Sequence, residues 1–284
     1  MKLGYLTDFS EEEVKFAREV GFDSLEISCN NKEANFWKVI SGKDGVRTIK
    51  EKMEENGLTI SALGFYFNQI QPQDWQKEGF SKLLEIAPEL GVKVICTFAG
   101  RNPEKSVEDN IPLFKKAFDP WIRKAEDKGI KIAIENCPMM CGYPFQGINI
   151  AFSPKAWDLI FEAIPSENLG LEFDPSHLYW LGVDYIQALK DYRDKVYHVH
   201  AKDTEILKEK VAKETIYGKR WWRYRLPGLG EIDWHKFIST LYDIGYEGAV
   251  AIEHEDPVYE GEKRREGLRL GYKHLSLWMI KEKK

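Results

Sequence analysis

The sequence has few cysteines, no complete cysteine-based zinc motif and no excess of positive charge. Four cysteines among 284 residues are too few for a disulfide framework. Cys137 and Cys141 lie four positions apart, but the sequence has no second pair to complete a structural zinc site. A net charge of −5 excludes the protein-wide positive field that favours nucleic acid binding.

Long hydrophobic runs are also missing. No stretch approaches the roughly 20 apolar residues that a membrane span requires. The first residues, MKLGYLTDFSEEE, contain no hydrophobic signal core and become acidic by position 11. Because 43% of the residues are hydrophobic, the chain can still form a large core. We expect a soluble, cytoplasmic protein without membrane or nucleic acid partners.

Short β-prone runs alternate with longer amphipathic stretches, several of which end in glycine, as helices often do. The runs cover residues 2–8, 24–28, 59–67, 93–100, 131–136, 169–177, 196–203 and 248–256. Eight strand–helix units without a flexible linker predict a single-domain (β/α)8 TIM barrel over residues 1–284. An open doubly wound sheet is the alternative, but GYLTDFS after the first run is no glycine-rich phosphate loop.

The last four predicted strands carry polar residues on one face. If their branched apolar residues face the helices, the alternate positions point into the barrel. Glu135, Asp174, His200 and Glu253 then lie at the carboxyl ends of consecutive strands, where the active sites of such barrels form. The alternative is four separate polar residues, each bonded to nearby loops.

Three carboxylates and an imidazole in one dry space would repel one another and lose their solvation. A divalent cation would offset both costs. We therefore predict one divalent metal ion, and the mostly oxygen ligand set favours Mn²⁺ over Mg²⁺, Co²⁺ or Zn²⁺. His198 and Glu172 lie one inward step deeper on neighbouring strands, where they would pair with each other or orient the ligands. For His198 an ordinary core position is the alternative.

Four motifs carry a family resemblance: IAIENCP, GLEFDPSH, VHAKD and AIEHED, in this order. Together they resemble the xylose-isomerase-like TIM-barrel superfamily of sugar isomerases and epimerases, and within it the ketose 3-epimerases and keto-sugar epimerases. The resemblance covers essentially the whole chain. It implies one divalent metal held by Glu135, Asp174, His200 and Glu253, with the two glutamates also acting as the acid/base pair.

The same resemblance implies substrate contacts outside the metal ligands. His177, in DPSH, matches a histidine that contacts the substrate. The family also has a substrate-binding arginine after the strand-seven histidine. In this chain no arginine follows closely, so Arg223 and Arg225 are the candidates.

The predicted chemistry is epimerisation or isomerisation of a keto sugar or keto-glycoside. It requires removal of a proton next to a carbonyl, with the metal stabilising the enediolate. A lyase or dehydratase, acting on an inosose or cleaving a keto-glycoside, begins in the same way and is the main alternative. Less favoured are an AP endonuclease, which needs a multi-metal cluster and more than these six histidines, and a non-catalytic sugar-binding protein.

About 30 residues, 204–233, separate the seventh predicted strand from the next helix, and loops of this length are usually functional. We predict a substrate lid, with a subunit interface as the alternative. The segment contains WWRYRLPGLG, in which Trp222 would stack on the sugar, while Asp203 would anchor the lid.

Three further residues complete the predicted site. Lys202 points inward above the metal and would meet the substrate, and Asn68 and Glu26 would bond sugar hydroxyls at the mouth of the barrel. A structural salt bridge is the alternative for Glu26. The expected partner is a small sugar substrate, and the sequence is compatible with a homodimer or homotetramer.

Overall fold

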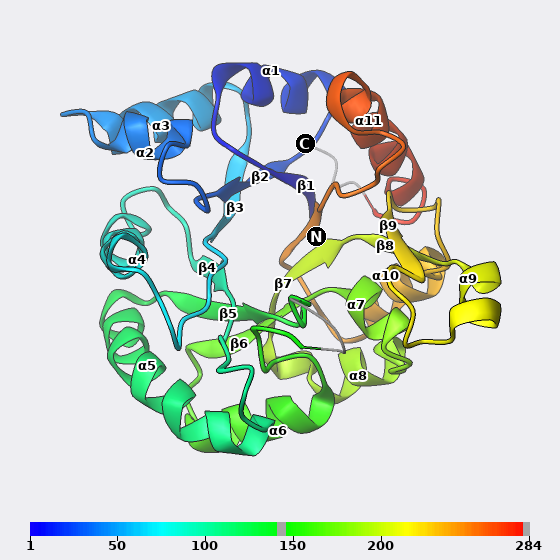
Figure 1. Ribbon diagram of the computed structural model, residues 1–284. Helices are drawn as coiled ribbons and strands as arrows, with labels where there is room; N and C mark the ends of the chain where they lie inside the picture. The colour runs from blue at the N-terminus through cyan, green and yellow to red at the C-terminus, as the bar shows by residue number, and fades with distance from the viewer. Residues whose placement is uncertain (141–145, 281–284) are drawn as a thin grey trace.

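In the computed structural model, which describes residues 1–140 and 146–280, parallel strands close into an eight-stranded barrel (Figure 1). The first strand pairs with both the second and the last, which closes the ring. The single-domain (β/α)8 prediction is confirmed. In spatial order the strands are β1 (Lys2–Thr7), β10 (Ala249–Ile252), β7 (Val196–Ala201), β6 (Leu169–Phe173), β5 (Lys131–Glu135), β4 (Val94–Thr97), β3 (Thr59–Gly64) and β2 (Ser24–Ser28).

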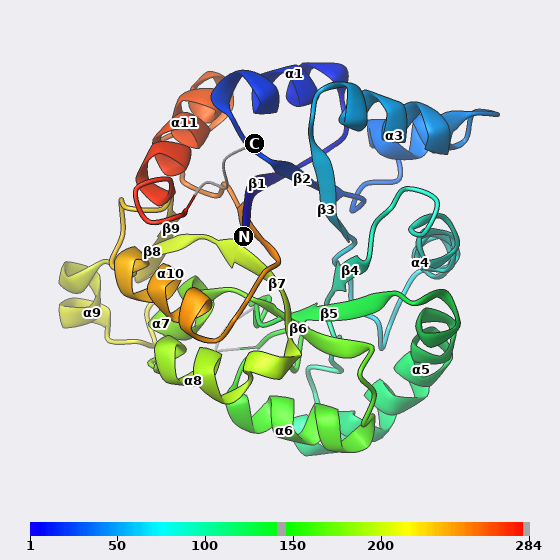
Figure 2. The ribbon, with the colours of Figure 1, turned by 180° about the vertical axis from the view of Figure 1, so that it is seen from behind.

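The helices form an outer ring around these strands, visible from both sides (Figures 1 and 2). Among the described residues, no helix is both long and apolar enough to cross a membrane. The α-helices of the described residues are α1 (Glu11–Val20), α2 (Asn35–Ile40), α3 (Gly45–Glu55), α4 (Asp74–Ile86), α5 (Val107–Lys128), α6 (Pro154–Ala163), α7 (Pro175–Trp180), α8 (Tyr185–Asp191), α9 (Lys208–Glu214), α10 (Trp234–Asp243) and α11 (Arg264–Leu275), with 3₁₀ turns η1 (Arg193–Lys195) and η2 (Gly261–Lys263).

The repeated helix–glycine–strand pattern has a local cause. Ser10 and Ser106 are the N-cap residues of α1 and α5, and each serine side chain accepts a hydrogen bond from a backbone N–H in the first turn. Gly21 and Gly129 end the same helices with φ values of 98° and 65°, a left-handed conformation that costs glycine little. The chain then turns directly into the next strand.

Two different cores result from the alternation of side chains along the strands. Branched residues such as Ile132, Val199 and Ile252 are fully buried between strands and helices. Inside the barrel, Ala62, Cys96 and Ala133 form a small separate cluster. Because these interior side chains are small, they leave room inside the barrel for polar groups.

Part of the segment expected as a long loop forms secondary structure. Strand β8 (Asp203–Ile206) pairs antiparallel with β9 (Trp222–Arg225), and α9 lies between them. Figure 1 shows this hairpin beside α10 and α7. Asp203 fixes the chain that follows, because its carboxylate accepts hydrogen bonds from the backbone N–H groups of Gly228, Gly230 and Ile232 and from the Trp234 indole.

The cysteine pair of the sequence is only half described. Cys137 is buried, while Cys141 lies outside the described residues. Cys29 and Cys96 are buried free thiols.

Candidate metal centre and substrate pocket

The four predicted ligands converge. Glu135 ends β5, Asp174 precedes α7, His200 lies on β7 and Glu253 follows β10. Each offers one ligand atom, and these four atoms all lie within 4.8 Å of one another. Glu135, Asp174 and His200 are buried, and the side chain of Glu253 is 15% exposed. The structure therefore brings together the four groups that the alternation of side chains along the strands predicted to face the barrel interior.

Asp174 shows how well this group fits a cation. Its Oδ1 accepts a hydrogen bond of 2.7 Å from the backbone N–H of Ser176 and so caps α7. Its Oδ2 is buried and accepts no hydrogen bond from any described residue, although Nζ of Lys202 and Nε2 of His177 each lie 3.3 Å from it. A buried carboxylate oxygen that lacks a hydrogen bond is costly, and a divalent ion would satisfy it. Three carboxylates and an imidazole are suitable ligands for such an ion.

Lys202 supplies part of the charge that the carboxylates need. Its Nζ lies 2.6 Å from Oε2 of Glu253 and 3.3 Å from Oδ2 of Asp174. Burial alone would lower the pKa of Lys202, but Glu253, Glu255 and Asp174 raise it well above its ordinary value. One ammonium balances one of the three ligand carboxylates, and a divalent cation would balance the other two.

The two glutamates are held ionised. Burial by itself would raise the pKa of Glu253, but the charges of Lys202 and His200 lower it below its ordinary value. The pKa of Glu135 is also lowered: burial and the charge of Glu253 oppose this, while hydrogen bonds from His177 and His200 produce it. Both groups are therefore in the ionised form that a general base requires.

A second polar layer lies against His200. Nε2 of His200 is 3.0 Å from both Oε2 of Glu26 and Oε1 of Glu172, while its Nδ1 faces Glu135 and Glu253. His198 Nδ1 lies 3.0 Å from the same Glu172 oxygen, which is the pairing expected from the sequence. These contacts fix the orientation of the His200 ring.

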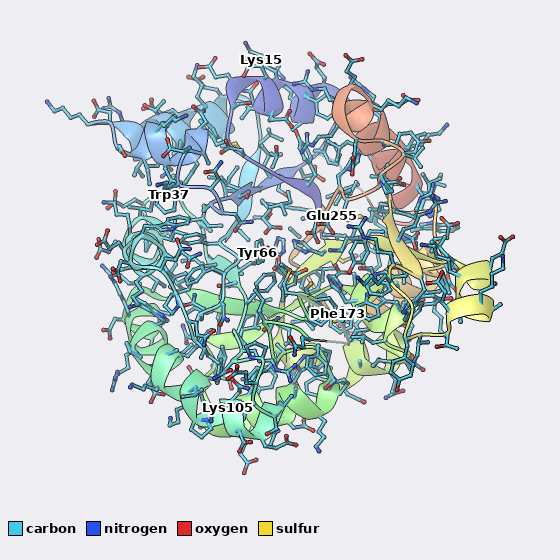
Figure 3. All side chains as sticks on the ribbon, viewed as in Figure 1. Lys15, Trp37, Tyr66, Lys105, Phe173 and Glu255 are labelled. Atoms are coloured by element: carbon cyan, nitrogen blue, oxygen red, sulfur yellow. The ribbon has the colours of Figure 1, made fainter. Side chains whose placement is uncertain are left out.

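Tyr66 joins this layer and was missed from the sequence. Its hydroxyl lies within hydrogen-bond distance of Glu26 and of Glu172, at 2.7 Å from the latter. Figure 3 shows Tyr66 toward the middle of the barrel, whereas Lys15 and Lys105 lie on the outer ring. Tyr66 follows β3 in the run GFYF, where its inward position could have been read from the two-residue period.

Two predicted contacts at the mouth of the barrel are corrected by the structure. Glu26 is fully buried, because it lies on the inward face of β2 under His200. Asn68 does not line the pocket. Its amide instead donates to the carbonyl of Arg101 at 2.7 Å and accepts from the N–H of the same residue at 3.0 Å.

A pocket of about 720 Å³ opens onto two of the predicted metal ligands, Glu135 and Glu253. Among the predicted substrate contacts, His177, Lys202 and Trp222 line it. Ligand pockets of 300–1,000 Å³ are typical of small-molecule sites. Its other lining residues include Glu135, Glu253, Glu255, Tyr66, Phe98, Trp180 and Tyr224.

The hairpin separates the predicted lid residues into two sets. Successive side chains of β9 point to opposite faces, so Trp222 and Tyr224 line the pocket. Arg223 and Arg225 are not pocket-lining residues. They lie 2.7 and 2.6 Å from Oε2 of Glu205, and Arg225 also contacts Asp256. In this structure the two arginines therefore face away from the pocket, because they lie on a strand with alternating faces and not in the loop expected from the sequence.

Tyr224 lines the pocket and was not among the residues predicted from the sequence. Its hydroxyl lies 3.0 Å from Nδ1 of His177, and Nζ of Lys202 lies 4.6 Å from the centre of its ring. On the other side of the imidazole, His177 Nε2 is 3.4 Å from Glu135 and 3.3 Å from Asp174. The pocket thus combines acidic, basic and aromatic groups around one space. Glu255, missed as well, also lies near the middle of the barrel (Figure 3).

The barrel and its polar interior agree with a comparison with protein families. Residues 14–276 match the model of the xylose isomerase-like TIM barrel, and the chain belongs to that family.

Two similar proteins are named for reactions of inosose. The chain is 26% identical to an inosose isomerase from Bacillus licheniformis over 91% of this chain and 88% of the relative. It is 27% identical to an inosose dehydratase from Clostridium perfringens over 75% of each chain.

Solved structures of similar proteins share the whole fold. The 3-keto-D-glucoside 4-epimerase from E. coli superimposes with a TM-score of 0.72 at 18% identity, covering 98% of this chain and 99% of that one. The IOLI protein, solved with a bound zinc atom, gives a TM-score of 0.71 at 20% identity with the same coverage. At such identities the likeness establishes the common fold.

Proposed function

We propose that the protein is a divalent-metal-dependent epimerase or isomerase of a keto sugar or keto-glycoside. One observation carries the proposal: Glu135 and Glu253 face the same pocket from β5 and from the end of β10. Their carboxylates lie 3.4 and 3.0 Å from Nδ1 of His200. Two ionised carboxylates beside one cation site are suited to moving a proton to and from a carbon atom.

Glu135, Asp174, His200 and Glu253 would hold the cation, and we propose Mn²⁺. When bound, the ion would act as a Lewis acid that polarises the substrate carbonyl and stabilises the negative charge developing on its oxygen. The IOLI protein, which has the same fold, carries zinc, and this supports a metal in the family. Glu26 and Glu172 would fix the tautomer of His200 by accepting a hydrogen bond from its Nε2–H.

The two glutamates would divide the proton transfers. One carboxylate removes the proton from the carbon next to the carbonyl, and the other, which must carry a proton at this point of the cycle, returns it to the opposite face of the planar intermediate. In the barrel order, β7 and β6 lie between β10 and β5, so the two groups approach the substrate from different directions. Lys202 would keep Glu253 ionised, and Trp222 would stack on the sugar ring.

The second candidate is a dehydratase or lyase on the same site. The observation in its favour is the His177–Tyr224 pair, which lines the pocket with 3.0 Å between Nδ1 and the hydroxyl oxygen. Such a pair could donate a proton to a departing oxygen. The inosose dehydratase relative supports this reading, since elimination also begins with removal of a proton next to a carbonyl.

Isotope exchange tests the proposal. The protein with Mn²⁺ is incubated in D₂O with a panel of ketoses, inososes and 3-keto-glucosides, and deuterium in the recovered sugar is measured by NMR. We expect exchange with inversion at one carbon, and Glu135→Gln or Glu253→Gln should abolish it. The exposed Glu89→Gln is the matched control. Exchange with loss of water or aglycone would favour the lyase, and no exchange with any compound would contradict the proposal.

A further inference from the structure

The pocket wall formed by the first four strands differs from the wall that carries the metal ligands. Its described lining residues are Leu6 on β1 and, after the ends of β2, β3 and β4, Asn30, Tyr66 and Phe98. Leu6 and Phe98 are apolar, and the Tyr66 hydroxyl lies within hydrogen-bond distance of the buried Glu26 and Glu172. Among the described residues of this wall, Asn30 is therefore the side chain that can offer an N–H group to a substrate.

The backbone that carries Asn30 is firmly held. The N–H of Cys29 donates to the carbonyl of Gly64 at 2.7 Å, which continues the pairing of β2 with β3. The indole of Trp37 donates to the carbonyl of Cys29 at 3.0 Å. The side chain of Asn30 adds a further link, because its Oδ1 accepts a hydrogen bond of 2.6 Å from the backbone N–H of Tyr66. The amide group is thus fixed relative to both strands.

The hydrogen bond from Tyr66 also decides which amide atom is left for a ligand. A backbone N–H can only donate, so the amide atom that faces it is the oxygen. The other atom, Nδ2, has no hydrogen-bond partner among the residues that the structure describes. Asn30 is exposed and lines the pocket, so its NH2 group can bind a substrate without giving up a contact to those residues.

Asn30 lies across the barrel from Asp174. In the ring of strands, three strands separate β2 from β6 in either direction, and the two lie on opposite sides in Figure 1. Asn30 follows β2, whereas Asp174 directly follows β6. A substrate whose carbonyl lies at the metal ligands therefore presents the far side of its ring to Asn30.

The NH2 group of Asn30 selects the kind of oxygen that it can bind. It offers the substrate donors and no acceptor, because its oxygen is already bonded to Tyr66. A substrate hydroxyl could accept this hydrogen bond, but its own hydrogen would find no acceptor on the apolar side chains of Leu6 and Phe98. An ether oxygen has no hydrogen to satisfy and is the better complement.

We infer that Asn30 is a specificity-determining residue that donates a hydrogen bond to an ether oxygen of a cyclic keto sugar, either the ring oxygen or the glycosidic oxygen. The inference rests on the proposed function and refines it: the substrate is a ring-closed keto sugar or keto-glycoside and not a cyclitol, whose carbocyclic ring has no ether oxygen. The carbonyl lies at Glu135 and Glu253, and the ether oxygen lies toward Asn30.

The contact is tested by binding, independently of turnover. The ¹⁵N-labelled protein, loaded with the diamagnetic Mg²⁺, is titrated with methyl 3-keto-β-D-glucoside and followed by NMR. Asn30→Asp assigns the side-chain NH2 signal by removing it, and this variant keeps an acceptor for the N–H of Tyr66. We expect the NH2 signal of Asn30 to shift. Asn31 is the internal control, because its Oδ1 also accepts from a backbone N–H, that of Glu33 at 2.9 Å, but it does not line the pocket.

Turnover supplies a second readout, from deuterium exchange into the same glucoside and into the carbocyclic scyllo-inosose. Asn30→Asp should lower the glucoside-to-inosose ratio of kcat/KM about tenfold, mainly through a higher KM for the glucoside, because one hydrogen bond to the bound substrate is lost. Asn31→Asp adds the same charge and should leave the ratio unchanged.

The outcomes separate the contact from the reaction. An Asn30 signal that does not move, or an unchanged ratio in Asn30→Asp, would overturn the role of Asn30 and leave the proposed reaction standing wherever exchange is observed. A shifted Asn30 signal without any deuterium exchange would overturn the proposed reaction but leave the contact.

Discussion

Nζ of Lys202 lies 2.6 Å from Oε2 of Glu253, and the lysine side chain is only 2% exposed. A buried ammonium at this distance holds the glutamate in its ionised form, against the effect of burial, which raises the pKa. Neither residue lies in a named strand; each directly follows the end of one, β7 and β10 respectively.

Replacing Lys202 tests this relationship. In Lys202→Met the pKa of Glu253 should rise, because burial is no longer opposed by the adjacent charge. The acidic limb of the pH profile for deuterium exchange should move to higher pH by about 1 unit or more. At pH 7 kcat/KM should fall on the order of 100-fold. Lys124→Met is the control, since it removes a lysine that pairs with Glu85 at 2.8 Å between the outer helices α5 and α4. An unchanged acidic limb in Lys202→Met would refute this role.

Metal dependence is testable through Asp174 and a second capping aspartate. Treatment with EDTA should abolish exchange, Mn²⁺ should restore it, and saturating Mn²⁺ should raise the Tm, as any ligand of the folded state does. In Asp174→Asn the Mn²⁺-induced rise in Tm should disappear. Asp184→Asn is the matched control, because Asp184 caps α8 as Asp174 caps α7 but lies outside the metal cluster. If both variants keep the same Mn²⁺ response, the assignment of Asp174 is wrong.

Asp203 should be a strong determinant of stability. Its carboxylate accepts hydrogen bonds from three backbone N–H groups and an indole in the segment that follows β9, at 2.8 to 3.1 Å. Asp203→Ala leaves these buried donors unpaired, so we expect a loss of about 3 kcal/mol or more in the free energy of unfolding, measured in urea. Asp233→Ala, which removes a single cap at α10, should cost about 1 kcal/mol. Equal losses would contradict the anchoring role of Asp203.

The contact between α1 and α11 should make stability depend on pH. Glu13 accepts hydrogen bonds from Arg264 at 3.1 Å and from Tyr5 at 3.0 Å, and Arg265 lies 3.3 Å away. Burial raises the pKa of Glu13, but Arg264 and these hydrogen bonds leave it lowered. A lowered pKa in the folded state means that the contribution is complete above the unfolded-state pKa of about 4.3 and is lost as pH falls through the folded-state value.

Glu13→Gln should therefore destabilise the protein by about 1–2 kcal/mol at pH 7, and the difference from the unsubstituted protein should shrink below about pH 4. Urea unfolding at both pH values measures it. Glu19→Gln, on the same helix with a 68% exposed side chain 3.9 Å from Arg269, should have little effect at either pH. A Glu13→Gln difference that stays constant with pH would contradict the ionic origin.

Local pattern was sufficient for the fold and for bringing the four candidate metal ligands together. In the strands that carry Glu135 and His200, buried branched residues alternate with small or polar ones, and a strand allows only one assignment of faces to such a pattern. The capping serines and the glycines after the helices set where each strand begins. The four candidate ligands converge because side chains alternate between the two faces of each strand and because the strands close into a ring.

Pattern was insufficient where the chain leaves the repeating units. Arg223 and Trp222 are neighbours in the same run, and only the pairing of β9 with β8 decides that the tryptophan faces the pocket and the arginine faces Glu205. Glu26 was expected at the mouth, but its depth depends on how the strands are staggered around the barrel, and the register shift between β2 and β3 falls at this residue.

The sequence by itself determined that this chain forms a closed barrel with three carboxylates and a histidine at one end, because side-chain alternation and helix caps act over a few residues. Only the tertiary structure decided which groups surround them. The contact of Tyr224 with His177, the pairing of Lys202 with Glu253 and the hydrogen bond from Tyr66 to Asn30 join residues from separate strands and loops. Their distances depend on strand stagger and on the placement of the hairpin, which are properties of the packed whole and leave no periodic signal in the chain.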